Sequence, residues 1–289
     1  MRRPDPTYAE RAGFDGAFLG TPVPLPVVGA SRAGDVATGP GVADGVLRYH
    51  HFSLMLSASR RFAFFVAANV DGRRRFTQAR DDDRWVIDPR LPGAQVGDEL
   101  YRDNDLDRGH LARRADMLWG DSLDEALAAV ADTFHYANCV PQHRDFNQNQ
   151  TTWQGLEDYV LTRIADGRLR ANVYTGPVFG EGDSDPTYRG VRIPRAFWKV
   201  VAAGTAGGRV HATAYLLEQS ALLTDLQRER EEPPLGPYLT FQTAVSHVEA
   251  LTGVDFGPLR AVDPFTPPPG AERGERPLVE LKSVEGVTL

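Results

Sequence analysis

The sequence predicts an α+β domain built around a mainly antiparallel sheet. Three observations carry this prediction: β-rich runs lie on both sides of a central helical stretch, the turns between neighbouring runs suit hairpins, and strands and helices do not alternate regularly as in a doubly wound fold. The chain has 289 residues, of which 42% are hydrophobic, so it can bury a large core. One large domain is therefore expected rather than two.

The first predicted strands follow a segment rich in Gly, Pro and Ala. Residues 1–45 are expected to form an extended arm laid over the domain rather than regular structure. The β-rich runs at 46–56 and 61–70 are separated by four residues, and Asp71-Gly72 ends the second run with a turn signal. These two runs are predicted to pair as a hairpin.

The middle of the chain combines a long loop with two helices. Residues 73–106 are polar and irregular, and a loop of this length inside a compact domain is usually functional. Ser122 and Glu125 form a capping box that predicts a short helix after them. A second helix is expected over 150–166, where apolar residues recur at spacings of three and four. Thr151 and Gln154 offer its capping pair.

The C-terminal half predicts three more strands and one helix. The strands are expected at 171–179, 196–203 and 209–218, and the helix at 241–253, ended by Gly253. A Pro-rich tail follows and is expected to be loosely packed. The predicted division is an arm at 1–45, a main domain at 46–257 and a tail at 258–289.

Composition excludes several classes of protein. The single cysteine, Cys139, excludes a disulfide framework and a Cys-rich zinc site, so any metal must be held by His, Asn, Asp, Glu and water. The first residues lack the apolar run of a signal peptide and no run of about 18 apolar residues occurs, which predicts a cytoplasmic protein without a membrane span, with export by a non-classical route as the alternative. A net charge of −7 argues against broad nucleic-acid binding but not against a narrow basic cleft.

Almost all the cationic residues are arginines. Only Lys199 and Lys282 are lysines, and the other 30 cations are Arg. GC-rich coding accounts for that ratio, but not for where the arginines gather, and Arg pairs bidentately with phosphate. The cluster comprises Arg60, Arg61, Arg73, Arg74, Arg75, Arg80, Arg84, Arg90, Arg108, Arg113 and Arg114.

Two segments of the chain contain residue types that can act together in one reaction. Residues 107–110 read DRGH, and residues 138–157 read NCVPQHRDFNQNQTTWQGLE. Phosphodiester hydrolysis needs a base for water, positive charge for the phosphorane and a stabiliser for the departing alkoxide. His110 can supply the base, arginines the charge, and a divalent ion such as Mg²⁺ the third function. Neutral Asn oxygens and the Glu157 carboxylate suit such an ion.

These segments resemble the DNA/RNA non-specific endonuclease family, which includes endonuclease G and is built on a ββα-metal core. The resemblance spans about residues 46–256 and rests on four motifs in order: DRGH, the N-x-x-P-Q that begins at Asn138, the F-N-Q at 146–148 and the W-x-x-L-E at 153–157. It implies that His110 is the general base and that Arg108 binds phosphate.

The resemblance also implies roles for the remaining residues. Asn147 would bind Mg²⁺ directly, with Mn²⁺ as an alternative ion, Glu157 would hold a metal-bound water, and Asn138 would help to position the site. The family also places an arginine from the preceding loop against the scissile phosphate. Arg80 is preferred for that role over the other two candidates, Arg75 and Arg84.

The metal asparagine has an alternative. Counting back eight residues from Glu157 selects Asn149, and eight residues on a helix leave two side chains roughly 80° apart. Counting forward from N-x-x-P-Q selects Asn147, whose F-N-Q context looks like the family's motif. Asn147 is preferred because two extra residues at a helix start are easily absorbed.

The predicted function is a Mg²⁺-dependent endonuclease that cleaves DNA and RNA with little sequence preference. Two alternatives stay open: a catalytically silent nucleic-acid-binding module of the same fold, and a phosphodiesterase for small nucleotides. Because such a nuclease would be toxic in a cytoplasm, an inhibitor or immunity protein, export or weak activity is expected. A homodimer is a further expectation, drawn from the resemblance alone.

Overall fold

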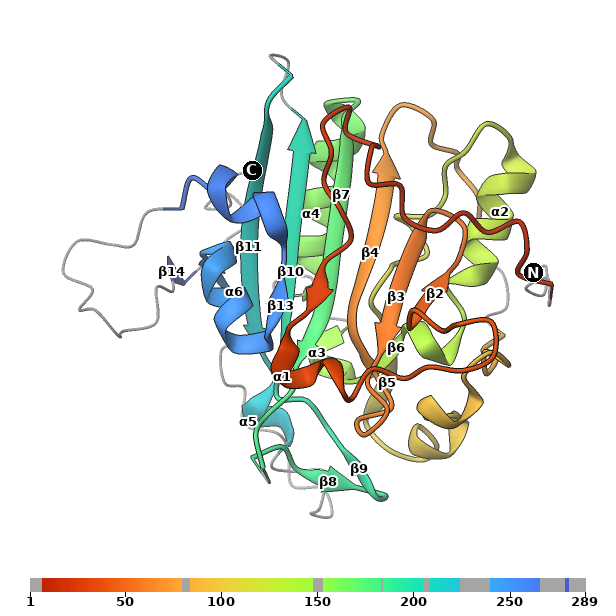
Figure 1. Ribbon diagram of the computed structural model, residues 1–289, viewed down its shortest axis with the longest axis vertical. Coiled ribbons are helices and arrows are strands. Elements are labelled where there is room, and N and C mark those ends of the chain that lie inside the picture. Colours follow the sequence, from red (N-terminus) through yellow and green to blue (C-terminus); the bar gives the residue numbers. More distant parts are fainter. Residues whose placement is uncertain are drawn as a thin grey trace.

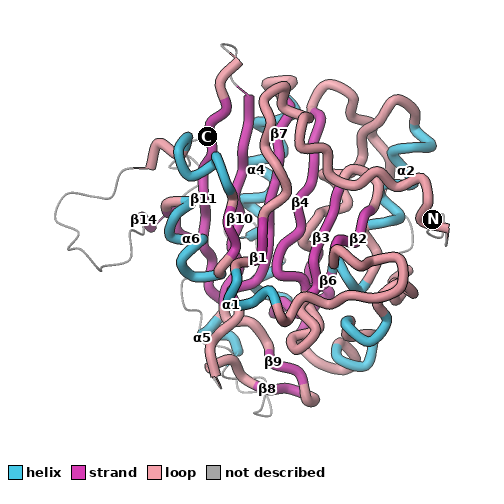
Figure 2. The backbone as a smooth tube through the Cα atoms, in the orientation of Figure 1, coloured by secondary structure: helices cyan, strands magenta, loops and turns pink. Residues whose placement is uncertain are grey.

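An eight-stranded antiparallel sheet forms the centre of the structure, a computed structural model that describes residues 7–79, 84–147, 153–182, 184–204, 208–223, 240–265 and 279–280. Figures 1 and 2 show the sheet face-on. Its strand order is β14-β12-β11-β10-β7-β4-β3-β2, and every neighbouring pair is antiparallel. The strands are β2 (Val46–Arg48), β3 (Phe52–Leu56), β4 (Ala63–Asp71), β7 (Arg170–Val178), β10 (Ala196–Gly204), β11 (Val210–Glu218), β12 (Thr240–Thr243) and β14 (Val279–Glu280). The predicted fold class is therefore confirmed.

The central strands are covered on both faces. All nine residues of β4 are buried. On β10, successive side chains point to opposite faces: the Trp198 ring packs edge-on against Phe256, whereas Lys199 reaches Glu157 on the other side. Covered strands need apolar residues at nearly every position, which explains the continuous apolar runs in the sequence.

Two different layers cover the sheet. On one face lie α3 (Arg144–Asn147) and α4 (Trp153–Asp166), where Phe146 packs against Phe197 with ring centroids 5.5 Å apart. Figure 1 shows α4 behind the sheet and the N-terminal segment with α6 (Val245–Thr252) in front of it. The front layer also contains the short β1–β13 pair, β1 (Val27–Val28) with β13 (Val254–Asp255), and α1 (Ala30–Ala33).

A small hairpin carries the DRGH motif beside the main sheet. It pairs β5 (Leu106–His110) with β6 (Cys139–His143) across a long connection that contains α2 (Leu123–Asp132), and β6 leads into α3 and then α4, which gives the ββα order. The remaining elements are α5 (Ser220–Leu223), β8 (Thr187–Tyr188), β9 (Val191–Arg192) and the 3-10 turns Pro92–Ala94, Asp98–Leu100, Tyr136–Asn138 and Gly257–Val262.

Two predicted elements are wrong in detail. The run at 46–56 is two strands, because His51 adopts a positive φ of 69° and the Tyr49 N–H bonds the Phe52 carbonyl across a tight turn. The run predicted as a helix over 241–253 begins as strand β12, which pairs with β11, and only then becomes helical. Gly253 ends that helix as predicted, in the left-handed region at φ 69°.

The other predicted strands and helices are confirmed, together with one cap. Ser122 accepts a hydrogen bond from the Glu125 N–H at the start of α2. The Glu125 carboxylate accepts from the Asp121 N–H rather than from that of Ser122, so the capping box is shifted by one residue. Helix α4 is described from Trp153, and its predicted capping residue Thr151 lies outside the described residues.

Both ends of the chain are more ordered than predicted where the structure describes them. The arm contributes β1 and the helical turn α1 instead of lacking regular structure. In the tail, Leu259 is 1% exposed, so the first residues after 257 pack onto the domain rather than loosely. The division into arm, domain and tail stays a prediction. No helix among the described residues has the length and apolar character needed to cross a membrane.

The N-terminal arm is fastened to α2 by a buried ion pair. The Arg11 guanidinium donates from Nε and Nη2 to the two oxygens of Asp132, at 2.7 and 2.8 Å. His50 Nδ1 lies 2.7 Å from the same carboxylate. These partners outweigh the opposing effect of burial and lower the pKa of Asp132 to about 2. The charged form of Asp132 therefore stabilises the fold.

Asp132→Asn is expected to lower stability by about 3–5 kcal/mol at pH 7, because it leaves the buried Arg11 charge uncompensated. The pKa of Asp132 is lower in the folded chain, so its contribution is complete above pH 4 and is lost as pH falls through 2. Urea unfolding at pH 7 and pH 3 should show the wild-type advantage shrinking by about 1 kcal/mol. Glu10→Gln, at an exposed carboxylate, is the control, and an advantage that does not shrink would contradict this account.

Candidate active site

The register of the small hairpin sets the position of His110 and Arg108. Arg108 pairs with Pro141 and His110 with Cys139. The two side chains are two residues apart on one strand and therefore lie on the same face of the hairpin. The strand thus presents a base and a cation side by side.

Gly109 is required by close packing. A Cβ atom at this position would lie 2.3 Å from the Gln142 side chain, which is fully buried on the paired strand. The φ of Gly109 is not positive, so the constraint is space rather than backbone conformation. The glycine of DRGH therefore allows the two strands and the Gln142 amide to pack together.

His110, Arg108, Asn147 and Glu157 line one cavity of about 690 Å³. They come from β5, α3 and α4, so the fold brings together residues that are up to 49 positions apart in sequence. Its remaining lining residues are Trp85, Asp107, Arg113, Arg114, Ala115, Phe134 and Gln154.

The imidazole of His110 is held between aromatic rings. Its centroid lies 4.6 Å from that of Trp85 and 4.9 Å from that of Phe134, the latter in an edge-on arrangement. The side chain is half-buried and faces the cavity. Rings on two sides fix the plane of the imidazole at the cavity wall.

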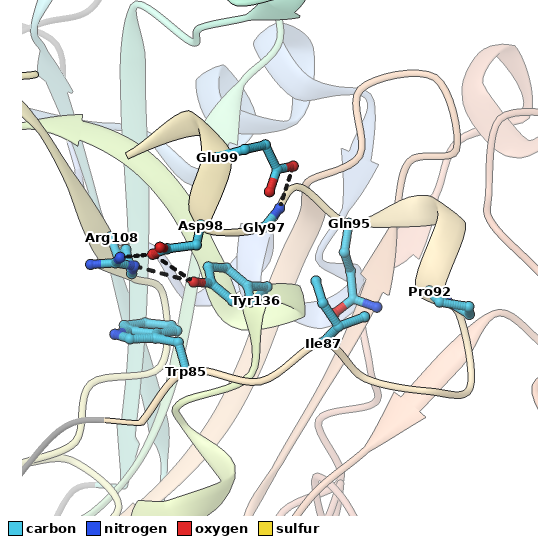
Figure 3. A pocket seen from close by; sticks show the side chains of 9 residues that line it. All are labelled: Trp85, Ile87, Pro92, Gln95, Gly97, Asp98, Glu99, Arg108 and Tyr136. Atoms are coloured by element: carbon cyan, nitrogen blue, oxygen red, sulfur yellow. Dashed lines mark hydrogen bonds and ion pairs between the residues drawn. The ribbon is translucent and has the colours of Figure 1, made fainter. Parts of the chain in front are cut away.

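The guanidinium of Arg108 is oriented by an acidic and a phenolic partner. Its Nη2 donates to Asp98, and its Nε lies 3.4 Å from the Tyr136 hydroxyl, as Figure 3 shows. The Tyr136 hydroxyl also donates to Asp98 at 3.2 Å. The guanidinium lies over the Tyr101 ring at 5.4 Å. This network holds the cation at the edge of the cavity.

Asn147 is oriented by a residue of the DRGH motif. Its Nδ2 donates to Oδ2 of Asp107 at 3.0 Å. None of the described residues donates a hydrogen bond to its Oδ1. Because the Asp107 carboxylate accepts from the amide nitrogen of Asn147, the amide oxygen Oδ1 is the atom left to bind other partners.

Glu157 is a buried carboxylate between two cations. Its Oε2 lies 3.1 Å from Arg113 Nε and its Oε1 lies 3.3 Å from Lys199 Nζ. Burial raises the pKa of Glu157, while Arg113 and Lys199 oppose that rise. Lys199 is 1% exposed and also donates to the Thr175 hydroxyl at 2.9 Å. The two cations offset part of the cost of burying this carboxylate.

Asn138 lies beneath the cavity rather than in it. The side chain is fully buried, accepts from the Ala112 N–H at 2.8 Å, and donates to the carbonyls of Ala112 and Thr133 at 2.9 Å. These bonds tie the chain just after His110 to the end of α2. The position suits a structural brace for the site and offers no contact with substrate.

The loop arginines are only partly described. The preferred candidate Arg80 and the alternative metal ligand Asn149 both lie outside the described residues. Arg84 is exposed beside Trp85. Arg75 has a buried Nη1 with no hydrogen-bond partner among the described residues, and burial lowers its pKa. Neither Arg75 nor Arg84 lines the cavity.

The cavity suits a metal ion that keeps most of its waters. Among the residues described, no three His, Cys, Asp or Glu side chains are grouped so as to hold a metal. Mg²⁺ needs no such group, since it is commonly bound through one or two protein oxygens and several waters. Asn147, Asp107, Gln154 and Glu157 bring side-chain oxygens to the cavity wall, and these are the oxygens available to such an ion.

Sequence reasoning missed three residues that shape the site. Asp107 orients Asn147, and its place inside DRGH was the available signal. Lys199 compensates Glu157, and its rarity in an arginine-rich chain was the only hint. Trp85 packs on His110, but nothing in the sequence distinguishes this tryptophan from a residue of the core.

Comparison with known proteins agrees with the geometry. Residues 31–262 match the DNA/RNA non-specific endonuclease family, so the chain belongs to that family. It is 41% identical over 262 residues to the uncharacterized protein y4fB of Sinorhizobium fredii, a match that covers 85% of this chain and 39% of that protein. It is 30% identical over 200 residues to mitochondrial endonuclease G of Homo sapiens, covering 65% of this chain and 59% of that protein. The chain thus spans less than two thirds of either relative.

The fold has a solved counterpart. A crystal structure of the EndoG/EndoGI complex, on the mechanism of EndoG inhibition, superimposes with a TM-score of 0.53 at 21% identity. The match covers 73% of this chain and 84% of the other. At this level of identity the likeness shows the shared fold.

Gly109→Ala is expected to destabilise the protein by about 1–3 kcal/mol, because the added methyl group overpacks the hairpin against Gln142. The control is Gly93→Ala, where a Cβ would meet nothing within 4 Å. Thermal unfolding compares the two variants, and the double variant Gly109→Ala, Gln142→Ala should recover part of the loss. Equal stability of the two single variants would show that packing does not require Gly109.

Proposed function

We propose that this protein is an endonuclease that hydrolyses phosphodiester bonds of DNA and RNA with the help of Mg²⁺. The observation that carries the proposal is the convergence of His110, Arg108, Asn147 and Glu157 on one cavity. These residue types supply a base, a phosphate-binding cation, a neutral metal ligand and a carboxylate. Membership of the nuclease family supports the same activity.

His110 acts as the general base in this proposal. Its ring is held by Trp85 and Phe134 but faces the cavity, where it can take a proton from a water that attacks phosphorus. A neutral imidazole can accept this proton near neutral pH. His110 therefore serves as a base and not as a metal ligand, since a metal-bound imidazole nitrogen could not accept the proton.

Arginines and Glu157 organise the rest of the reaction. Arg108 at the edge of the cavity binds an oxygen of the scissile phosphate, and its bond to Asp98 keeps the guanidinium aligned. Arg114 adds positive charge along the cavity wall, whereas the charge of Arg113 is paired with Glu157 and Asp158. Each oxygen of Glu157 has one cationic partner and retains a lone pair with which it can accept a hydrogen bond from water.

Asn147 is the residue proposed to hold the ion. Its Oδ1 accepts no hydrogen bond from the described residues, and Asp107 fixes the amide in that orientation. The bound ion would supply positive charge that stabilises the phosphorane and the departing alkoxide. Asn138 is proposed to position the loop after His110, and Arg80 remains a proposal for the loop arginine.

The substrate and partners follow from the same site. A cavity that reads phosphate rather than base edges gives little sequence preference, which suits both DNA and RNA. One structural neighbour is an EndoG/EndoGI complex, and on that likeness a protein inhibitor is proposed as a partner of this chain as well.

Purified protein is expected to cleave plasmid, linear DNA and RNA with Mg²⁺ but not with EDTA. His110→Ala should reduce the rate about 10²–10⁴-fold, the usual contribution of general-base catalysis. His211→Ala, which changes a half-buried histidine on β11, is the control and should retain the rate. Gel assays under matched salt measure all three proteins.

The same proteins, assayed also for binding to DNA and RNA and for cleavage of a small bis-ester, separate the two alternatives. Binding of DNA and RNA without cleavage by the wild-type protein would indicate the silent binding module. Cleavage of a small bis-ester but of neither polymer would indicate the small-nucleotide phosphodiesterase. Either result would contradict the proposed function.

A further inference from the structure

A second cavity of about 710 Å³ adjoins the candidate active site. Trp85 and Arg108 line both cavities, so the two are joined through these side chains. Figure 3 shows the second cavity with Tyr136 and Asp98 beside Arg108, and Ile87 and Glu99 further along. Whatever occupies it lies directly beside the phosphate proposed to bind at Arg108.

One part of the second cavity is apolar and partly aromatic. The rings of Trp85 and Tyr136 have centroids 5.7 Å apart, tilted by 38°. Ile87 is 38% exposed, and among the described residues it is one of three large hydrophobic side chains that are exposed, the others being Val27 and Leu123. An exposed apolar side chain beside two aromatic rings offers a surface for a flat ring.

The polar part of this cavity is acidic. Asp98 is already engaged by Arg108, Tyr136 and Arg102. Glu99 is exposed, and its Oε1 accepts from the Gly97 N–H at 3.1 Å, whereas its Oε2 accepts from none of the described residues. Arg108, at the boundary, is the one cation among the lining residues that the structure describes. Two carboxylates disfavour a phosphate here and favour a neutral group with N–H donors.

We propose that this cavity binds an unpaired nucleobase of the nucleotide next to the scissile phosphate. The inference rests on the proposed function and deepens it. A base is a flat neutral ring that stacks on aromatic side chains, and each base carries N–H donors on its Watson–Crick edge. Trp85 and Ile87 provide the stacking surface, and Glu99 accepts from the base edge.

Such a base subsite selects single-stranded over double-stranded nucleic acid rather than a particular base sequence. In a duplex, the Watson–Crick edge is paired and both faces of the base are stacked, so the base can reach Glu99 only after it leaves the helix. Unpaired segments of DNA or RNA therefore bind more tightly than the matching duplex. A carboxylate acceptor distinguishes poorly among bases, because all of them offer an N–H.

The test uses binding of a fluorescein-labelled single-stranded oligonucleotide in EDTA, measured by anisotropy, with wild-type protein and the variants Ile87→Ala and Glu99→Gln. Both variants should bind roughly threefold to tenfold more weakly, through lost apolar contact or a lost charge-assisted hydrogen bond. Leu123→Ala, an exposed residue of similar exposure on α2, and Glu10→Gln are matched controls that should bind as the wild type does.

A set of oligonucleotides with one abasic site, moved stepwise along the strand, tests the identity of the ligand. At one position the abasic site should weaken wild-type binding and remove the difference between wild type and both variants. Unchanged binding by both variants, or differences that persist at every abasic position, would overturn the subsite.

The results that would overturn the base subsite differ from those that would overturn the proposed nuclease activity. Wild-type protein that binds the strand through this cavity but cleaves no polymer with Mg²⁺ would contradict the nuclease activity and support the subsite. Normal cleavage by Ile87→Ala and Glu99→Gln with unchanged strand affinity would support the activity and overturn the subsite.

Discussion

The buried carboxylate of Glu157, held between Arg113 and Lys199, is the interaction on which the site depends. It joins helix α4 to the chain just after DRGH through Arg113 and to strand β10 of the central sheet through Lys199. A buried carboxylate is costly unless it is paired, and breaking such a pair costs about 3–5 kcal/mol. The main sheet therefore fixes the position of the small ββα unit.

Buried residues fix the positions of the groups that line the cavity. Gln142 and Gly109 set the spacing of the hairpin, Asn138 braces the chain after His110, and Asp107 turns the amide of Asn147. The groups that face the cavity are thus fixed by partners that do not need to touch a substrate. Because strands β5 and β6 and the helix after them follow this order in the chain, one short unit can bring together a base, a cation and a neutral oxygen.

The sequence predicted the antiparallel sheet because apolar runs and turns are local signals, whereas the ββα core was implied by the resemblance to the family and its strands β5 and β6 were not predicted from the residues. It failed at His51, where one positive φ divides a run into two strands, and at 241–243, where pairing with β11 overrides a helical pattern. Residues of the cavity were found through motifs. Asp107, Lys199 and Trp85 act through contacts between distant segments, which no local pattern encodes.

The central proposal is that Asn147, held by Asp107, presents its oxygen to a divalent ion in the cavity that His110 also lines. Anomalous diffraction from crystals of His110→Ala soaked with Mn²⁺ and a short oligonucleotide tests it most directly. The account predicts one strong peak at about 2.1–2.2 Å from Oδ1 of Asn147, close to the Mg²⁺ distance. A peak on Asn149 instead, or no peak within the cavity, would contradict it.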